Sequence, residues 1–223
     1  MKLVHPDMEM QIQFDVLSGC EWIIEPPESF ARYVEELYAQ SEGAEGRFVL
    51  SESDRELAVS KSAEVIINPF SVNINDKKVI NKLYAELSET AYGEEMFLKT
   101  QELTAYLQNY FLHLEHLQVH MLEADLEIDM TALFKAMGVR LCNFANDFFE
   151  NLNQYVKILA ELMRKKLIVF VNVGSYLSEV QIEQLLETAS YHEIAVLFME
   201  SRQKSFSNKV RQYIIDSDYC EIF

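Results

Sequence analysis

Two uninterrupted apolar runs near the C-terminal end constrain the fold of this chain more than any other feature. Residues 167–171 and 194–198 are each of strand length and carry no alternating polar residue. Such runs are typical of strands that are buried on both faces of a sheet. Residues 178–189 between them have helical spacing and begin with the capping box Ser178-x-x-Gln181. The order strand, helix, strand predicts a parallel βαβ unit.

The N-terminal part adds short strand signals and one helix. Residues 8–14 alternate between apolar and polar side chains, which predicts a half-buried strand. Residues 20–24, 48–50 and 65–67 are further short apolar runs, and Pro27 is suited to open a helix over residues 28–40. We therefore predict an α/β head built from residues 1–75 and 167–223.

Residues 76–166 have a different character, with no proline and long helical periods. Two seams repeat apolar residues at steps of three and four: Leu103, Leu107, Tyr110, Leu114, Leu117 and Met121, and then Phe148, Leu152, Tyr155, Leu159 and Leu162. Two such seams in one chain predict an antiparallel helical arm or bundle inserted into the head. A shorter helix over residues 130–137 is expected to end at Gly138.

Charge and cysteine usage restrict the partners and the compartment. The formal net charge is −17, which disfavours nucleic acid as a partner because phosphate binding needs Lys and Arg. Residues 201–215 are an exception, since they hold four bases and no acid: Arg202, Lys204, Lys209 and Arg211. Three widely separated cysteines, no signal peptide and no apolar run of membrane-spanning length predict a cytoplasmic protein with reduced thiols.

No motif for nucleotide binding or nucleophilic catalysis is present. The six glycines form neither a phosphate loop nor a dinucleotide-binding fingerprint. After the strand at residues 20–24 the chain continues Glu25-Pro26-Pro27-Glu28, whose charge would repel phosphate. The basic residues 164–166 follow a helix and are expected to interact with the negative end of its dipole. The sequence predicts neither a nucleotide cofactor nor an enzyme.

One acidic segment is a candidate metal site. Glu123, Asp125, Glu127 and Asp129 alternate with other residues, and in a bend several of them could converge on calcium, which takes six to eight oxygen ligands. The segment lacks the EF-hand spacing, so a solvated acidic link between helices is the favoured interpretation from the residues alone. The helix-spaced histidines 113, 116 and 120 similarly favour a polar flank over a metal site.

Several segments resemble one protein family. The stretch Arg164-Lys-Lys-Leu-Ile-Val-Phe-Val-Asn-Val-Gly-Ser-Tyr-Leu-Ser178 is similar to the central signature of the small type II-A CRISPR adaptation proteins, the Csn-two family. Residues 133–139 and 196–202 are similar to the family's short arm helix and to the strand after the signature. The resemblance extends from about residue 47 to the C-terminal end.

This resemblance implies a fold and a function. Family members have an α/β head similar to a phosphate-loop ATPase core without its nucleotide loop, and a helical arm. They form a homotetrameric ring whose positively charged hole takes the ends of double-stranded DNA, and calcium stabilises that ring. They act without known catalysis in spacer acquisition, part of antiviral defence, alongside the adaptation integrase and the RNA-guided effector nuclease.

The resemblance also implies site residues. Glu123, Asp125, Glu127 and Asp129 occupy the place of the family's acidic stretch and would bind calcium. Lys135 and Arg140 flank the matching arm helix and are candidate DNA contacts, beside the basic run from Arg202 to Arg211. Two other functions stay open: a helical protein-interaction scaffold that does not bind DNA, and a metal-dependent nuclease that uses Glu123, Asp125 and the histidines.

Overall fold

The computed structural model describes residues 1–15, 19–53, 55–125, 127–145, 147–203 and 210–222. The chain forms two compact units. Unit 1 comprises Met1–Ile74 and Asn143–Phe223, and unit 2 comprises Asn75–Cys142. The mixed α/β class agrees with the sequence, but the second boundary lies after residue 142, whereas the helical periods had placed it after residue 166. Each unit is described below by itself.

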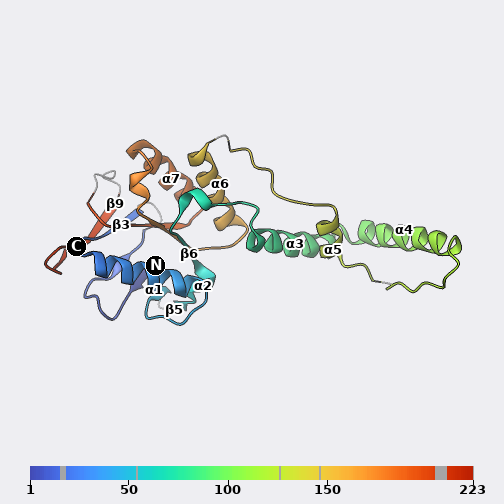
Figure 1. Cartoon of the computed structure of the whole chain (residues 1–223), viewed down its shortest axis with the longest axis horizontal. Coiled ribbons are helices and arrows are strands. Elements are labelled where there is room, and N and C mark those ends of the chain that lie inside the picture. The colour runs from blue at the N-terminus through green and yellow to red at the C-terminus, as the bar shows by residue number, and fades with distance from the viewer. Residues whose placement is uncertain (16–18, 54, 126, 146, 204–209, 223) are drawn as a thin grey trace. The chain divides into compact units, whose positions relative to one another are not determined.

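Unit 1 is built on a six-stranded sheet (Figure 1). Its strands, in spatial order, are β10 (Glu221–Ile222), β9 (Val210–Ile215), β3 (Gly19–Ile24), β8 (Ala195–Glu200), β7 (Leu167–Val171) and β6 (Ala63–Ile66). All neighbours pair in parallel except β10, which is antiparallel to β9. The predicted βαβ unit is confirmed, because β7 and β8 pair in parallel on either side of α7 (Glu179–Tyr191) in the chain.

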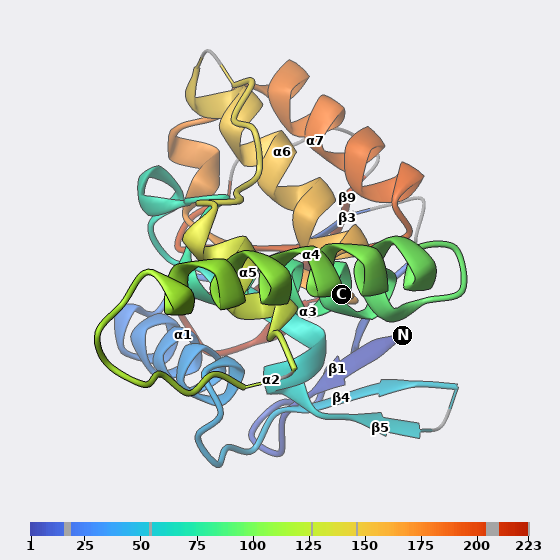
Figure 2. The same cartoon turned by 90° about the vertical axis from the view of Figure 1, so that its right-hand side faces the viewer.

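One face of this sheet packs against α1 (Pro27–Ser41) and a small second sheet. The second sheet is antiparallel, with the order β2 (Ile12–Gln13), β1 (Lys2–Val4), β4 (Val49–Glu52) and β5 (Arg55–Leu57) (Figure 2). A short helix, α2 (Val59–Ser62), leads into β6. Trp22, Tyr33 and Leu50 join the three elements in one buried apolar cluster.

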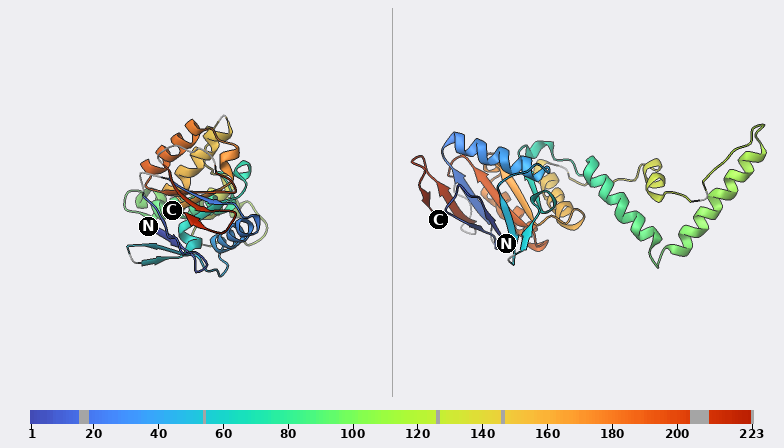
Figure 3. Two further views of the ribbon diagram at one scale, coloured as in Figure 1. Left: turned by 90° about the vertical axis from the view of Figure 1, so that its left-hand side faces the viewer. Right: turned by 90° about the horizontal axis from the view of Figure 1, so that it is seen from below.

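The opposite face is covered by α6 (Phe148–Glu161) and α7, which Figure 3 (left) shows together on one side of the sheet. The predicted pairing of the two seams in one arm is therefore wrong. The buried side of α6, which includes Leu152, Val156 and Leu159, belongs to unit 1. An apolar stripe with three- and four-residue steps packs equally well on a sheet or on a helix, so periodicity alone does not identify its partner.

The predicted strand over residues 8–14 is reduced to β2. Met10, Ile12 and Phe14 are buried as the alternation predicted. However, the N–H groups of Glu9 and Met10 donate to the two carboxylate oxygens of Glu221, at 3.0 and 2.6 Å, instead of to a neighbouring strand. A side chain more than two hundred residues away in the sequence thus takes the place of the hydrogen bonds that a neighbouring strand would have made.

Other local signals are confirmed. Pro27 is the first residue of α1, and Ser178 and Gln181 form the capping box of α7. Gly138 has a φ of +66°, and its N–H donates to the carbonyl of Lys135 beyond the end of α5 (Met130–Ala136).

Two residues of β3 show how tightly the strand is packed. A Cβ atom added to Gly19 would lie 2.6 Å from Cδ2 of Leu186 on α7. The Cys20 thiol donates to the carbonyl of Gln13, 3.2 Å away, and burial raises its pKa to about 12. Cys20 is therefore a neutral thiol at physiological pH.

A buried lysine connects three segments of unit 1. Nζ of Lys165 donates to the carbonyls of Ser60 at 2.9 Å and Ala63 at 2.6 Å, and it lies 3.4 Å from a carboxylate oxygen of Glu64. Lys165 follows α6, but the carbonyls that it binds belong to the end of α2 and the start of β6. The lysine therefore caps a helix other than the one that precedes it in the chain.

Unit 2 consists of α3 (Lys77–Tyr92), α4 (Phe97–His116) and α5. A bend at Gly93 separates α3 from α4, as Figure 3 (right) shows, and the buried hydroxyl of Thr100 donates to the carbonyl of Ala91 across it. The first predicted seam is helical only as far as His116, so Met121 lies beyond the helix. Among the described residues, no helix combines the length and the apolar character needed to cross a bilayer.

Candidate nucleic-acid interface

The contacts between α3 and the region around α5 define one end of unit 2. The hydroxyl of Tyr84 donates to the carbonyl of Val139 at 2.9 Å, and the rings of Tyr84 and Phe134 lie 6.5 Å apart. The side chain of Asn75 makes two hydrogen bonds to the backbone of Leu141, at 3.1 and 2.9 Å. These contacts place Arg140 close to the first turn of α3.

Exposed bases gather in this part of unit 2. The predicted candidates Lys135 and Arg140 are both exposed, and the first half of α3 adds Lys77, Lys78 and Lys82. Within the described part of the chain, Lys77, Lys82, Lys135 and Arg140 form no ion pair. Sequence reasoning missed the lysines of α3. Their signal was the spacing of Lys78 and Lys82, which puts them one turn apart on the same side of a helix.

Several bases of unit 1 are neutralised by acids. Arg47 pairs with Asp7 at 3.0 Å and with Glu36 at 3.1 Å. Arg32 also pairs with Asp7, while Lys165 and Lys166 pair with Glu64 and Glu52. A phosphate backbone would have to compete with these carboxylates, whereas Lys77, Lys82, Lys135 and Arg140 need no such exchange.

The basic run near the C-terminal end does not form one patch in the described structure. Arg202 follows the carboxyl end of β8, whereas Arg211 is the second residue of β9 and is aligned with Cys20 of β3. Arg211 therefore lies near the amino ends of the parallel strands and Arg202 beyond their carboxyl ends. At about 3.3 Å per residue, the two positions are roughly 16 Å apart along the strand direction. Lys204 and Lys209 lie outside the described residues.

Arg211 contributes to a groove of about 450 Å³ with Tyr213 and Glu9. A hydrogen bond with Tyr213 raises the pKa of Arg211 further above its ordinary value. Arg211 therefore keeps its charge, but a tyrosine and an acid already lie beside it.

The acidic segment does not form a metal site within the described residues. Glu123, Asp125, Glu127 and Asp129 are all exposed. Asp129 is the N-cap of α5, since its carboxylate accepts from the N–H of Thr131 at 2.8 Å. Among the described residues, no three His, Cys, Asp or Glu side chains lie close enough to hold an ion, and this includes the histidines of α4. These carboxylates do not fit a calcium ion in the conformation described.

The seam of α4 is open to solvent. Tyr110 is 59% exposed, Leu103 and Leu114 are each 40% exposed, and Leu117 is 79% exposed. Thr100 is the one buried residue described on this twenty-residue helix. An exposed apolar stripe of this length is typical of a surface that packs against another molecule.

The carboxyl end of β3 offers no cradle for a phosphate. A phosphate-binding helix presents free N–H groups and a positive dipole end. The first residue of α1 is Pro27, which has no N–H, and the next is Glu28. The expected likeness of the head to a phosphate-loop ATPase core stays a prediction.

The fold and these surfaces define an α/β protein with a helical insertion that carries exposed bases and an open apolar helix. Residues 40–219 match the family model described as CRISPR-associated protein (Cas_Csn2). The chain therefore belongs to the Csn2 family of CRISPR-associated proteins, with its place in CRISPR adaptation, and the resemblance seen in residues 164–178 is confirmed.

Individual relatives agree with this assignment. The chain is 28% identical over 203 residues to "CRISPR-associated protein Csn2" of Enterococcus faecalis, which covers 88% of this chain and 87% of that protein. It is 34% identical over 100 residues to "CRISPR-associated protein Csn2" of Streptococcus agalactiae, and this match covers 44% of this chain and 44% of that protein. The crystal structure of Stu0660 of Streptococcus thermophilus is similar in fold, with a TM-score of 0.60 and 12% identity over 97% of this chain and 75% of that one.

Proposed function

We propose that this protein is a non-catalytic, sequence-independent binder of double-stranded DNA ends in CRISPR spacer acquisition. The observation that carries the proposal is the group of exposed bases in unit 2 that have no acidic partner among the described residues: Lys77, Lys82, Lys135 and Arg140. The phosphates of a DNA duplex would supply the negative charges that pair with these four bases.

A homotetrameric ring resolves the conflict with the net charge of −17. Four copies of the same few bases converge on one duplex, and acids on the outside are screened beyond about 8 Å at physiological salt. The open seam of α4 supports self-assembly, because an apolar stripe of this length is more stable when another copy covers it.

Binding to calcium is part of the proposal, supported by the composition of residues 123–129 and by family membership. It requires this segment to change its conformation. Calorimetric titration of calcium should show binding that Glu123→Gln with Glu127→Gln weakens, whereas Glu94→Gln with Glu102→Gln leaves it unchanged. Asp129 is left intact because it caps α5. Equal calcium affinity in both double variants would refute the site.

The partners follow from the same proposal. The protein would act in the cytoplasm with the adaptation integrase and the RNA-guided effector nuclease, and it would bind no nucleotide. Its contribution would be to hold a DNA end for these enzymes rather than to cut or join DNA.

DNA binding is tested by comparing two double charge reversals with equal changes in net charge. Lys135→Glu with Arg140→Glu removes two bases of unit 2, and Arg55→Glu with Lys157→Glu removes two exposed bases of unit 1. In a tetramer the first variant loses up to about eight phosphate contacts, so the slope of log affinity against log salt should fall by about seven. The second should keep most of the slope.

Two outcomes would contradict the proposal. If both double variants lost the same affinity, the effect would come from net charge and not from an interface in unit 2. If closed circles bound as tightly as linear fragments of the same length, the protein would not recognise ends. Light scattering that shows a monomer with and without calcium would refute the ring.

A scaffold that uses α4 to recruit proteins without touching DNA is the second candidate, and the exposed seam favours it. A gel shift with linear duplex separates the two functions. The nuclease alternative has weaker support, because the acids and histidines that it needs do not converge among the described residues. DNA that remains intact in magnesium or manganese would remove it.

A further inference from the structure

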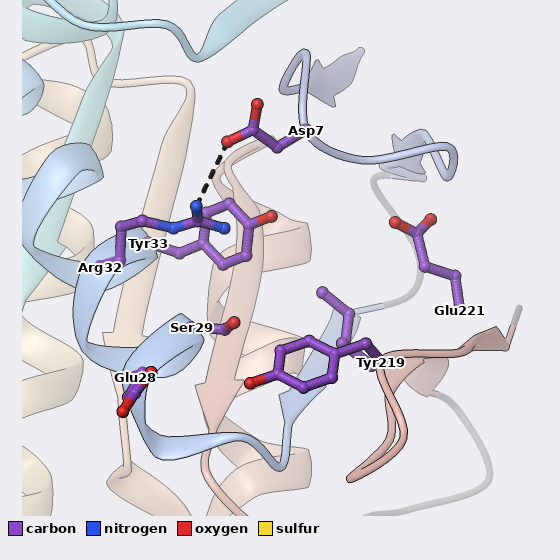
Figure 4. Close-up of a pocket in the computed structure, with 8 residues that line it drawn as sticks. Asp7, Glu28, Ser29, Arg32, Tyr33, Tyr219 and Glu221 are labelled. Atoms are coloured by element: carbon purple, nitrogen blue, oxygen red, sulfur yellow. Dashed lines mark ion pairs between the residues drawn. The ribbon is translucent and has the colours of Figure 1, made fainter.

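Unit 1 contains a cavity that none of the surfaces discussed above uses. It has a volume of about 390 Å³ and lies at the carboxyl ends of β3 and β9, between the first turns of α1 and the β9–β10 turn (Figure 4). Ligands of open α/β sheets bind outside the carboxyl ends of the strands. The position is therefore one where a binding site is expected.

The charges around this cavity favour a cation. Asp7, Glu28 and Glu221 line it, and Arg32 is the one base among its lining residues. Arg32 is held by Asp7 at 3.4 Å, and its guanidinium lies 4.7 Å from the centre of the Tyr33 ring. The single positive charge is thus paired, and the cavity remains negative.

A serine hydroxyl in the wall has no hydrogen-bond partner among the described residues. Ser29 is 9% exposed and lines the cavity, and Figure 4 shows its hydroxyl directed into the space between Arg32 and Tyr219. No other described residue forms a hydrogen bond with this hydroxyl. The hydroxyl is open to the cavity, and its oxygen can accept a hydrogen bond from a ligand that carries a donor.

Aromatic rings complete the wall. Tyr219 has a φ of +62°, and a turn fixes that conformation, because the Asp216 carboxylate accepts from the N–H groups of Asp218 and Cys220. The turn places the ring of Tyr219 beside the cavity, which Tyr33 also lines. Aromatic faces attract organic cations and pack along the methylene groups of long side chains.

We propose that this cavity binds the side chain of a lysine or arginine from a basic segment of a partner protein. The cationic head donates to Ser29 and is balanced by Glu28, while the aliphatic stem packs along Tyr219. A phosphate is disfavoured by the carboxylates and by Pro27 at the start of α1. Among the described residues, no carboxylates group closely enough here to hold a metal ion.

This inference does not depend on DNA binding, and its test contains no DNA. The probe is a fluorescein-labelled peptide in which three lysines are separated by pairs of glycines, and its binding is measured by anisotropy at physiological salt. Glu28→Gln and Ser29→Ala should each weaken binding about threefold, and together about tenfold. Glu35→Gln is the matched control, since it removes the same charge from an exposed position on the same helix.

Tyr219→Gly guards against loss of folding. Glycine accepts the positive φ without strain, so this variant removes the whole side chain without straining the turn. It should weaken binding while melting at the same temperature or higher. An arginine version of the peptide should bind, whereas acetylated lysines, which keep the aliphatic stem and lose the charge, should not.

The result that overturns the proposal is direct. Either equal binding by Glu28→Gln and Glu35→Gln or undiminished binding of the acetylated peptide would show that the peptide binds elsewhere or by its stem alone. Displacement of the peptide by stoichiometric calcium would identify the cavity as a metal site instead.

Discussion

Replacing Lys165 with methionine tests whether the buried lysine holds unit 1 together. Methionine keeps an unbranched apolar stem out to the ε position and removes the charged amino group with its donors. The carbonyls of Ser60 and Ala63 then lose their partner, and Glu64 loses its cation. The change should destabilise unit 1, because buried acceptors without donors are costly.

The magnitude follows from these contacts. Two hydrogen bonds from a charged donor contribute about 1.5 kcal/mol or more each, and breaking a buried ion pair at one partner costs about 3–5 kcal/mol. The side chain of Glu64 is 20% exposed, so water recovers part of its interaction. We expect Lys165→Met to lower the free energy of unfolding by about 3 kcal/mol.

The measurement uses urea and the fluorescence of Trp22, the single tryptophan, which is fully buried in unit 1. Its signal follows this unit even if unit 2 unfolds separately. Lys166→Met is the control, because the side chain of Lys166 is half exposed and its Nζ lies 3.8 Å from a carboxylate oxygen of Glu52. It should cost less than about 0.5 kcal/mol. If the two variants unfolded at the same urea concentration, the contacts of Lys165 would not contribute to the stability of unit 1 as we infer.

Three further changes have definite expected results. Gly19→Ala should cost about 1–3 kcal/mol in urea unfolding because the new Cβ would meet Leu186, and the same change should cost less in a Leu186→Ala background, where the clashing atom is absent. Raising the pH above about 9 should destabilise the wild type relative to Cys20→Ala, by about 1 kcal/mol at pH 10, because the unfolded thiol ionises near its ordinary pKa of 9.0 while the folded thiol stays neutral up to about 12. A difference in stability that does not change with pH would contradict this. Gly138→Ala should lower the melting temperature of unit 2, since its φ of +66° costs an alanine about 1 kcal/mol, and an unchanged temperature would show that the cap can rearrange.

Local sequence signals predicted local structure well. Pro27, the Ser178 capping box, Gly138 and the apolar run of β7 act within a few residues, and the structure has each of them where the sequence placed it. Features that depend on distant partners were not predictable. The stripe of α6 specifies an apolar face but not the sheet that it covers.

In the candidate site, too, the residues with a local sequence signal were predicted and those that depend on distant contacts were not. Lys135 and Arg140 were found through their place beside a matching helix, but Lys77 and Lys82 gain significance only because Tyr84 and Asn75 bring the end of α5 back to α3. Lys165 was expected to interact with the helix that it follows. It caps α2 instead, because the chain places Ser60 and Ala63 next to it across about a hundred residues of sequence.

The double hydrogen bond between Asn75 and Leu141 has a consequence for how the protein can be taken apart. It brings Asn75, the first residue of unit 2, beside Leu141, the last residue but one, and in unit 1 the side chain of Asn151 likewise donates to the carbonyl of Val72. The chain segments that enter and leave unit 2 therefore lie close enough for a short glycine linker to join residue 75 directly to residue 141. A miniature lacking residues 76–140 should then fold around the six-stranded sheet and leave the excised helices to be grafted elsewhere.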